Sequence, residues 1–264
     1  MDKKMIVVDL DGTLLNINGG CSRNTKRYLK RLKDMGYIIV IATGRVLGDA
    51  VKITDGADFA NYIISNSGGL IYDMGLKKII MKKGISKDIA RYIYSLDNDD
   101  IEYITICDLF DYYRYKSLDK MDLFFDKGIN DMDKFITECE EIIHMIIKFK
   151  DDGLVNEYYT LLDNGNVRVL VMQDSFVDNK WIEVFGYGTS KYDSIKIICD
   201  REGISNCDVI SFGDGRNDID MLKNSGIGVA MGKALLDVKK VSDYITRTHN
   251  DDGVIYFLKS YLND

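Results

Sequence analysis

Short apolar runs alternate with amphipathic segments in the first third of the chain. The runs 5–8, 37–41 and 62–65 have the length and unbroken apolar character of strands that are buried on both faces. Between them, 22–35 and 46–54 carry apolar residues at helical spacing. This order predicts a parallel sheet with right-handed crossovers. Two further runs, at 70–73 and 77–81, predict a hairpin after it.

The alternation of predicted strands and helices ends at about residue 82. Several strands now follow one another with few helices between them, which favours an α+β unit with antiparallel pairing. The pattern predicts helices at 86–96, 131–140 and 151–162, and strands at 101–107, 142–149, 167–172 and 181–185. Residues 109–126 have no assignable pattern. We interpret 82–187 as an inserted domain.

The parallel rhythm returns at residue 188. Ser190-Lys-Tyr-Asp193 is a capping box that opens a helix, and this helix is expected to end at Gly203. Strands are predicted at 209–212, 226–230 and 244–245, and helices after residue 218 and at 254–262. The predicted fold class is therefore α/β. Residues 1–81 and 188–264 form a Rossmann-like parallel sheet with helices on both faces, and 82–187 form an α+β insertion.

Composition narrows the possible partners and compartment. A net charge of −7 over 264 residues argues against a broad nucleic-acid surface or an anionic-membrane surface, but not against one local positive pocket. Five scattered cysteines without a C-x-x-C pair favour a reducing, cytoplasmic location. The two histidines are too far apart in sequence to suggest a zinc site. No apolar run has the length of a membrane span. Oligomeric state is left open.

Two carboxylates follow the first predicted strand. Asp9 and Asp11 are two residues apart, so their side chains are expected to point the same way, and Gly12 allows a sharp turn behind them. Such a pair is unfavourable unless a cation neutralises it. The stretch therefore predicts a metal site.

Polar residues also stand at other strand ends. Thr43 follows the second strand, Lys191 opens the helix after the insertion, and Asp214, Asn217 and Asp218 follow a later strand. In an open α/β sheet the carboxyl ends of the strands meet at the ligand site, so these side chains should converge. Carboxylate oxygens suit Mg²⁺, and a lysine with a threonine suits a phosphoryl group.

In this order and spacing the motifs resemble those of the haloacid dehalogenase superfamily. They read Asp-Leu-Asp-Gly-Thr-Leu, Ala-Thr-Gly-Arg, Ser-Lys and Gly-Asp-Gly-Arg-Asn-Asp. The insertion resembles, by position and size only, the large α/β (C2-type) cap of the Cof-type phosphatases. The segments 226–232 and 250–254 also resemble that group. The likeness covers 1–81 and 188–264.

The resemblance implies a role for each motif residue. Asp9 is implied as the nucleophile that becomes an aspartyl phosphate, and Asp11 as the general acid and base. Mg²⁺ is implied to be held by Asp9, the backbone carbonyl of Asp11, and Asp214. Thr43, Gly44, Lys191 and Asn217 are implied to bind the phosphoryl group, with Asp218 supporting the metal's outer shell or orienting Lys191. Further candidates for substrate contacts are Arg45, Arg216 and Asn66.

Some positions have structural alternatives. Asn217 could N-cap the following helix, and Asp220 could simply favour its dipole. His144 is expected to be structural, and His249 is left open. This sequence also departs from the family pattern at Tyr192, Lys233 and Ser67.

The leading hypothesis is a Mg²⁺-dependent phosphatase that acts on a small phosphorylated metabolite such as a sugar phosphate. The alternatives are a phosphomutase or phosphotransferase on the same scaffold, and a non-catalytic phosphoryl-binding protein. The last of these is disfavoured because every chemical position is filled.

Overall fold

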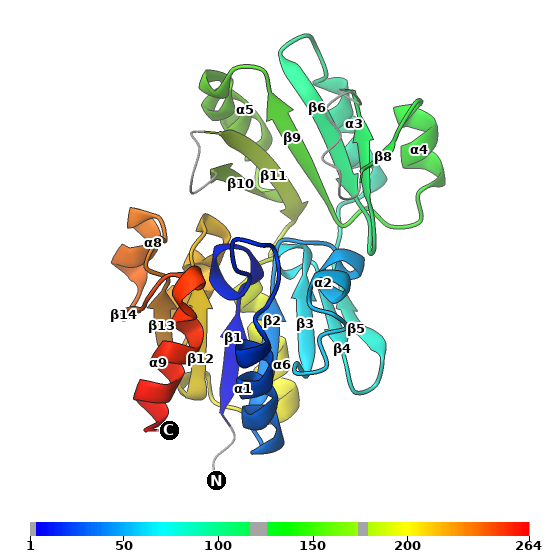
Figure 1. The fold of residues 1–264 in the computed structure, drawn as a ribbon. Coiled ribbons are helices and arrows are strands. Elements are labelled where there is room, and N and C mark those ends of the chain that lie inside the picture. The colour runs from blue at the N-terminus through cyan, green and yellow to red at the C-terminus, as the bar shows by residue number, and fades with distance from the viewer. Residues whose placement is uncertain (1–3, 117–125, 174–178, 264) are drawn as a thin grey trace.

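Two β-sheets, each with its own hydrophobic core, make up the protein (Figure 1). The computed structural model describes residues 4–116, 126–173 and 179–263. The first sheet has eight strands in the order β14-β13-β12-β1-β2-β3-β4-β5. They are β1 (Met5–Val8), β2 (Ile38–Ala42), β3 (Tyr62–Ser65), β4 (Leu70–Asp73), β5 (Lys78–Lys82), β12 (Val209–Gly213), β13 (Ile227–Ala230) and β14 (Tyr244–Ile245).

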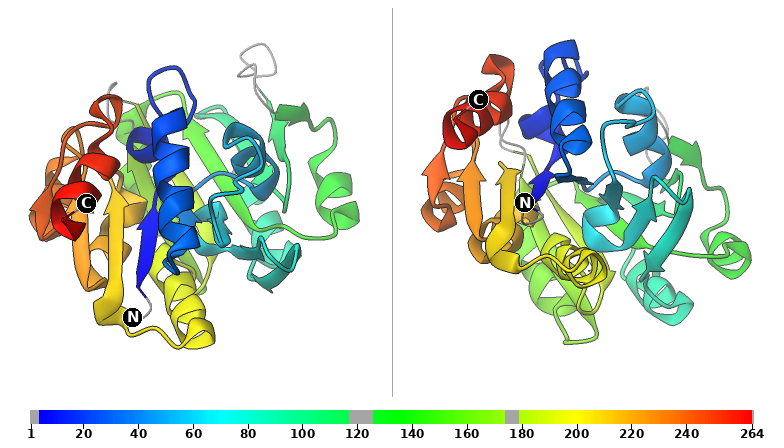
Figure 2. Two further views of the ribbon diagram at one scale, coloured as in Figure 1. Left: turned by 60° about the horizontal axis from the view of Figure 1, so that its bottom comes forward. Right: turned by 90° about the horizontal axis from the view of Figure 1, so that it is seen from below.

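The first sheet is parallel from β14 to β3 and antiparallel at β4 and β5. Its helices are α1 (Arg23–Asp34), α2 (Leu47–Ile53), α6 (Lys191–Glu202), α7 (Ile219–Asn224), α8 (Leu236–Val241) and α9 (Gly253–Leu262). Helices α1 and α9 cover one face and α6 the other (Figure 2). The predicted α/β class with helices on both faces is confirmed. We call this body the core.

The second sheet lies wholly within the insertion and has the order β10-β11-β9-β6-β7-β8. Its strands are β6 (Ile101–Cys107), β7 (Tyr112–Tyr115), β8 (Asp126–Gly128), β9 (His144–Phe149), β10 (Val167–Gln173) and β11 (Lys180–Gly186). Its helices are α3 (Lys87–Ser95), α4 (Met132–Glu138) and α5 (Val155–Leu162). We call this body the cap. As expected from consecutive strands, most of its pairs are antiparallel.

Local sequence explains where the long helices begin. The Ser22 hydroxyl accepts a hydrogen bond from the backbone N–H of Thr25 at 3.1 Å and caps α1. Ser190 caps α6 in the same way, by accepting from the N–H of Asp193 at 3.0 Å. This second cap matters for function because Lys191 is the first residue of α6.

Two segments differ from the sequence-based assignment. Residues 109–126 had no predicted structure, and they include β7 and the start of β8, while 117–125 lie outside the described residues. Helix α8 was not predicted at all. Within the described ranges, no helix has the length and apolar character needed to cross a membrane.

Candidate active site

A wide helical turn, Leu10–Leu14, follows β1. This turn packs against β12. Gly12 has φ +72° in this turn, and a Cβ there would come within 2.2 Å of Asp214 Oδ2. Only glycine accommodates both the backbone angle and the close approach. The next residue, Thr13, donates from Oγ1 to Asp214 Oδ1 at 3.1 Å. Thr13 is therefore a site residue that the sequence interpretation missed, although it lies inside the first motif.

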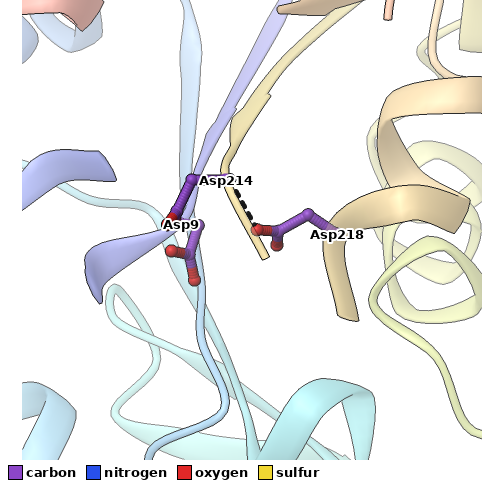
Figure 3. A group of neighbouring side chains, drawn as sticks. All are labelled: Asp9, Asp214 and Asp218. Atoms are coloured by element: carbon purple, nitrogen blue, oxygen red, sulfur yellow. Dashed lines mark hydrogen bonds between the residues drawn. The ribbon is translucent and has the colours of Figure 1, made fainter. Parts of the chain in front are cut away.

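Three buried carboxylates meet where β1 and β12 end (Figure 3). Each of Asp9, Asp214 and Asp218 offers an oxygen, and these oxygens all lie within 4.8 Å of one another. The fully buried ammonium of Lys191 reaches two of them, at 2.7 Å from Asp9 Oδ1 and 2.6 Å from Asp218 Oδ1. Residues separated by about two hundred positions thus form one cluster, as the strand-end pattern predicted.

The cluster holds more negative charge than Lys191 balances. Burial raises the pKa of Asp9 well above its usual value, and the neighbouring carboxylates add to this while Lys191 opposes it. Burial and Asp218 also raise the pKa of Asp214, to about 7, against the opposing effects of Thr13 and Lys191. Burial lowers the pKa of Lys191, but Asp218 and Asp9 outweigh it and the pKa rises. Hard oxygen donors with uncompensated charge fit a divalent cation such as Mg²⁺.

Asp218 has a second set of contacts besides Lys191. Its Oδ2 accepts a hydrogen bond from the backbone N–H of Asp214 at 2.9 Å (Figure 3) and another from that of Gly215 at 3.0 Å. Asp218 therefore fixes the loop that presents Asp214 and also holds the ammonium. Of the two roles suggested for it, orienting Lys191 corresponds to an observed contact.

Asp11 is not part of this buried group, and its side chain is 56% exposed. The expectation that Asp9 and Asp11 point the same way was wrong in its premise, because the strand ends at Val8 and the alternation of side chains does not extend to Asp11. Both of its carboxylate oxygens accept from Arg45, which also donates to Asp49 Oδ2 at 2.6 Å. Burial lowers the pKa of Arg45, but its hydrogen bond to Asp11 and the charges of both aspartates raise it above its usual value. The structure thus gives Arg45, expected as a substrate contact, two carboxylate partners.

A second wall comes from the ends of β2 and β3. The Thr43 hydroxyl accepts from the N–H of Arg45 at 3.1 Å, and the Asn217 amide donates to Ser67 Oγ at 3.2 Å. A Cβ on Gly44 would lie 3.4 Å from both Asn217 Nδ2 and Ser67 Oγ. These four positions therefore lie together, as predicted for Thr43, Gly44 and Asn217. Ser67 was noted only as a departure from the family pattern.

The remaining candidates lie between core and cap. Asn66 Nδ2 donates to the carbonyl of Asp108 at 3.2 Å and lies 3.3 Å from His144 Nδ1 in β9. His144 is buried and stacks on Phe185. The described contacts of Asn66 thus join it to the cap, and His144 has the structural surroundings expected of it.

Arg216 and Asp220 also contact the cap. Arg216 donates to the carbonyl of Val171 at 3.3 Å and to Gln173 Oε1 at 3.4 Å, both in β10. Asp220 accepts from Arg168 at 2.9 Å. Burial and Lys233 lower the pKa of His249, which the sequence left open, and the backbone of Gly12 beside the cluster opposes this.

Comparisons with known proteins identify relatives of the chain. The 5-amino-6-(5-phospho-D-ribitylamino)uracil phosphatase YcsE of Bacillus subtilis is 27% identical over 262 residues, which cover 99% of this chain and 97% of that one. A second phosphatase of the same name from that organism, YitU, is 27% identical over 266 residues, which cover 98% of this chain and 97% of that one.

Solved structures give the same picture. A haloacid dehalogenase-like hydrolase from Bacteroides thetaiotaomicron has a TM-score of 0.82 at 26% identity, with coverage of 98% of this chain and 100% of that one. A haloacid dehalogenase subclass IIB sugar phosphatase shares the fold, with a TM-score of 0.80 at 22% identity and 98% coverage of both chains. The family model for haloacid dehalogenase-like hydrolases matches residues 6–258. The chain belongs to that family of hydrolases.

Proposed function

We propose that the protein is a Mg²⁺-dependent phosphatase that hydrolyses the phosphate ester of a small metabolite through an aspartyl phosphate. One observation carries this proposal: Lys191 is buried between Asp9 and Asp218, with Asp214 beside them at the carboxyl edge of the sheet. The names of the relatives, which include phosphatases of a phosphorylated ribitylaminouracil and a sugar phosphatase, support the substrate class.

In the first step a carboxylate oxygen of Asp9 attacks phosphorus, and the bond from phosphorus to the ester oxygen breaks. Asp11 gives its proton to the departing alkoxide. In the second step Asp11 takes a proton from water as the water oxygen attacks phosphorus, which releases phosphate and restores the Asp9 carboxylate. Lys191, Thr43 and Asn217 hold the phosphoryl oxygens in both steps.

Asp9, Asp214 and the backbone carbonyl of Asp11 are the groups that would hold Mg²⁺. When bound, the ion supplies positive charge that offsets the repulsion between a carboxylate and a phosphate dianion. Residues 82–187 form the cap in this proposal, and 1–81 with 188–264 form the catalytic core. A cytoplasmic location belongs to the same proposal and is supported by the cysteine pattern.

The test is Mg²⁺-dependent hydrolysis of p-nitrophenyl phosphate by the wild type, Asp9→Asn and Asp11→Asn. We expect Asp9→Asn to be inactive because an amide cannot form the acyl phosphate. Asp11→Asn should be slowed about 10²- to 10⁴-fold through loss of proton transfer. Full Mg²⁺-dependent activity in Asp9→Asn would contradict the mechanism. Product analysis with added sugar separates hydrolysis, which releases free phosphate, from transfer to a sugar hydroxyl.

A further inference from the structure

In the described part of the cap, the helices lie on one face of the sheet, and the other face is turned to the core. Ile104, Met145 and Ile182 belong to the cap's hydrophobic cluster, on the face that α3, α4 and α5 cover. Side chains alternate along a strand, so the residues between them point the other way. His144 on this second face meets Asn66 of the core, and Tyr112 Oη accepts from the N–H of Val46 at 3.1 Å. The residues that align with His144 across neighbouring strands, here called the His144 row, therefore lie against the core.

The next row of the same face carries polar groups. Strand register aligns Leu170, Glu183, Ile146, Thr105 and Arg114 across five strands, two residues further from the core than the His144 row. Three of them are buried although they are polar, with exposures of 8% for Glu183, 2% for Thr105 and 7% for Arg114.

Glu183 is only half satisfied in this position. Its Oε1 accepts from Trp181 Nε1 at 2.9 Å, whereas its Oε2 is buried with no hydrogen-bond partner among the described residues. Thr105 Oγ1 is buried and unpartnered in the same sense. The hydrogen bond to Trp181 needs only one of the two carboxylate oxygens. Burying the other without a partner lowers the free energy of unfolding, so a role in positioning Trp181 does not explain it. The cap sheet thus has two buried polar oxygens for which the described residues supply no partner.

The Glu183 carboxyl also lies within electrostatic reach of the candidate active site. Burial raises its pKa most, while Trp181, Lys191 and Arg168 lower it. Lys191 is the ammonium between Asp9 and Asp218. Arg168, two residues from Leu170 on the same face, donates to the carbonyl of Thr189 at 2.8 Å, so this face of the cap sheet lies next to the start of α6. Strands β11 and β6 are separated by β9, which puts Glu183 and Thr105 about 10 Å apart.

We propose that Glu183 is a specificity-determining residue that accepts a hydrogen bond from a hydroxyl or N–H group of the substrate's leaving group. Thr105 accepts or donates a second bond. The substrate class is the phosphate ester of an uncharged, polyhydroxylated alcohol such as a sugar or polyol, because an anionic leaving group would be repelled by the carboxylate. This inference rests on the proposed phosphatase function.

The test compares Glu183→Gln with the wild type and with Glu157→Gln, a matched change on the outer helix α5 where Glu157 is exposed. Substrates are ribose 5-phosphate, glucose 6-phosphate, sorbitol 6-phosphate and p-nitrophenyl phosphate. The leaving group of the last ester carries no hydroxyl or N–H donor. We expect kcat/KM for the best sugar or polyol ester to fall about 10- to 100-fold in Glu183→Gln. Turnover of p-nitrophenyl phosphate should stay within about twofold, and Glu157→Gln should match the wild type.

Thr105→Val, which keeps the shape and removes the hydroxyl, should give a smaller loss with the same selectivity. An equal loss on all substrates, or no loss on any, overturns the inference, as does a wild type that prefers p-nitrophenyl phosphate to every hydroxylated ester. These outcomes leave the phosphatase proposal intact. A wild type that hydrolyses none of the four esters overturns the proposed function itself.

Discussion

Arg45 donates two hydrogen bonds to Asp11, from Nε to Oδ2 at 2.7 Å and from Nη2 to Oδ1 at 2.6 Å. Its third nitrogen binds Asp49, whose side chain is only 3% exposed. One guanidinium thus joins the exposed carboxylate proposed as the acid to a buried carboxylate in the first turn of α2. The planar fork of arginine suits this bridging better than a lysine would.

Replacing Arg45 with methionine should destabilise the protein as well as slow turnover. The variant leaves Asp49 buried without the cation that neutralises it, and burial already raises the pKa of Asp49. Because Arg45 is partly exposed, we expect a loss of about 1–3 kcal/mol in the free energy of unfolding. Urea unfolding of Arg45→Met measures it. The double variant Arg45→Met/Asp49→Asn should recover part of the loss, and equal stability of the two variants would rule out the buried charge as the cause.

Gly12 and Gly19 provide a matched pair of substitutions. Both have φ near +72° (+72° and +73°), but a Cβ on Gly12 would collide with the Asp214 carboxylate, while one on Gly19 would meet nothing within 4 Å. Gly19→Ala should therefore cost only the backbone strain, about 1 kcal/mol. Gly12→Ala should also displace Asp214 and lower phosphatase activity at least tenfold. Thermal unfolding and kinetics with p-nitrophenyl phosphate check both, and equal activity in the two variants would contradict the requirement for close approach.

Much of the core could be predicted because its strands are unbroken apolar runs. The segments at β1, β2 and β3 are buried on both faces, which leaves few alternatives for their structure. Strand β7 lacked this signal, because its sequence Tyr-Tyr-Arg-Tyr puts an arginine next to a tyrosine on one face and two tyrosines on the other. Helix α8 has six residues and no side-chain cap, so neither periodicity nor a cap marked it.

The positions at which strands end predict which residues meet at the site. They do not predict which of these side chains hydrogen-bond one another. The strand-end rule brings Asp9 and Asp214 together whatever their rotamers, and Lys191 joins them from the start of α6, which follows the insertion. That Arg45 binds Asp11, or that Thr13 binds Asp214, depends on side-chain torsions that sequence spacing leaves free. The chemical roles of these residues remain predictions that the variants above test.

Metal removal should lower the stability of the wild type. Three clustered carboxylates and one ammonium leave net negative charge that Mg²⁺ can offset, so Mg²⁺ at a hundredfold excess over its Kd should add about 2.7 kcal/mol. Thermal unfolding in EDTA and in MgCl₂ measures this increment without any substrate.

Asp214→Asn should lose the increment but be at least as stable as the wild type in EDTA, because it removes one of the mutually repelling carboxylates. The exposed residue Asp58 supplies the control, since Asp58→Asn should keep the full increment. An undiminished effect of Mg²⁺ on Asp214→Asn would argue that the ion binds elsewhere.

His144 should make the stability of the cap depend on pH. Burial lowers its pKa from 6.5 to about 3, so the folded cap holds the ring neutral against Phe185 and Asn66. Between these two pKa values the unfolded chain binds a proton that the folded chain does not. The contribution is therefore complete above pH 6.5 and is lost as the pH falls towards 3. At pH 5 the loss should be about 2 kcal/mol relative to pH 8.

The single tryptophan of the chain, Trp181 in β11, makes this measurable in the cap itself. Urea unfolding followed by its fluorescence at pH 8, 6.5 and 5 should show the wild type losing more stability than His144→Gln, whose side chain does not titrate. The variant itself should be less stable at pH 8, because an amide replaces a ring that stacks on Phe185. Only the difference in pH dependence tests whether the buried histidine is neutral. If the free energy of unfolding changes with pH equally in the two proteins, the prediction is wrong, even if their absolute stabilities differ.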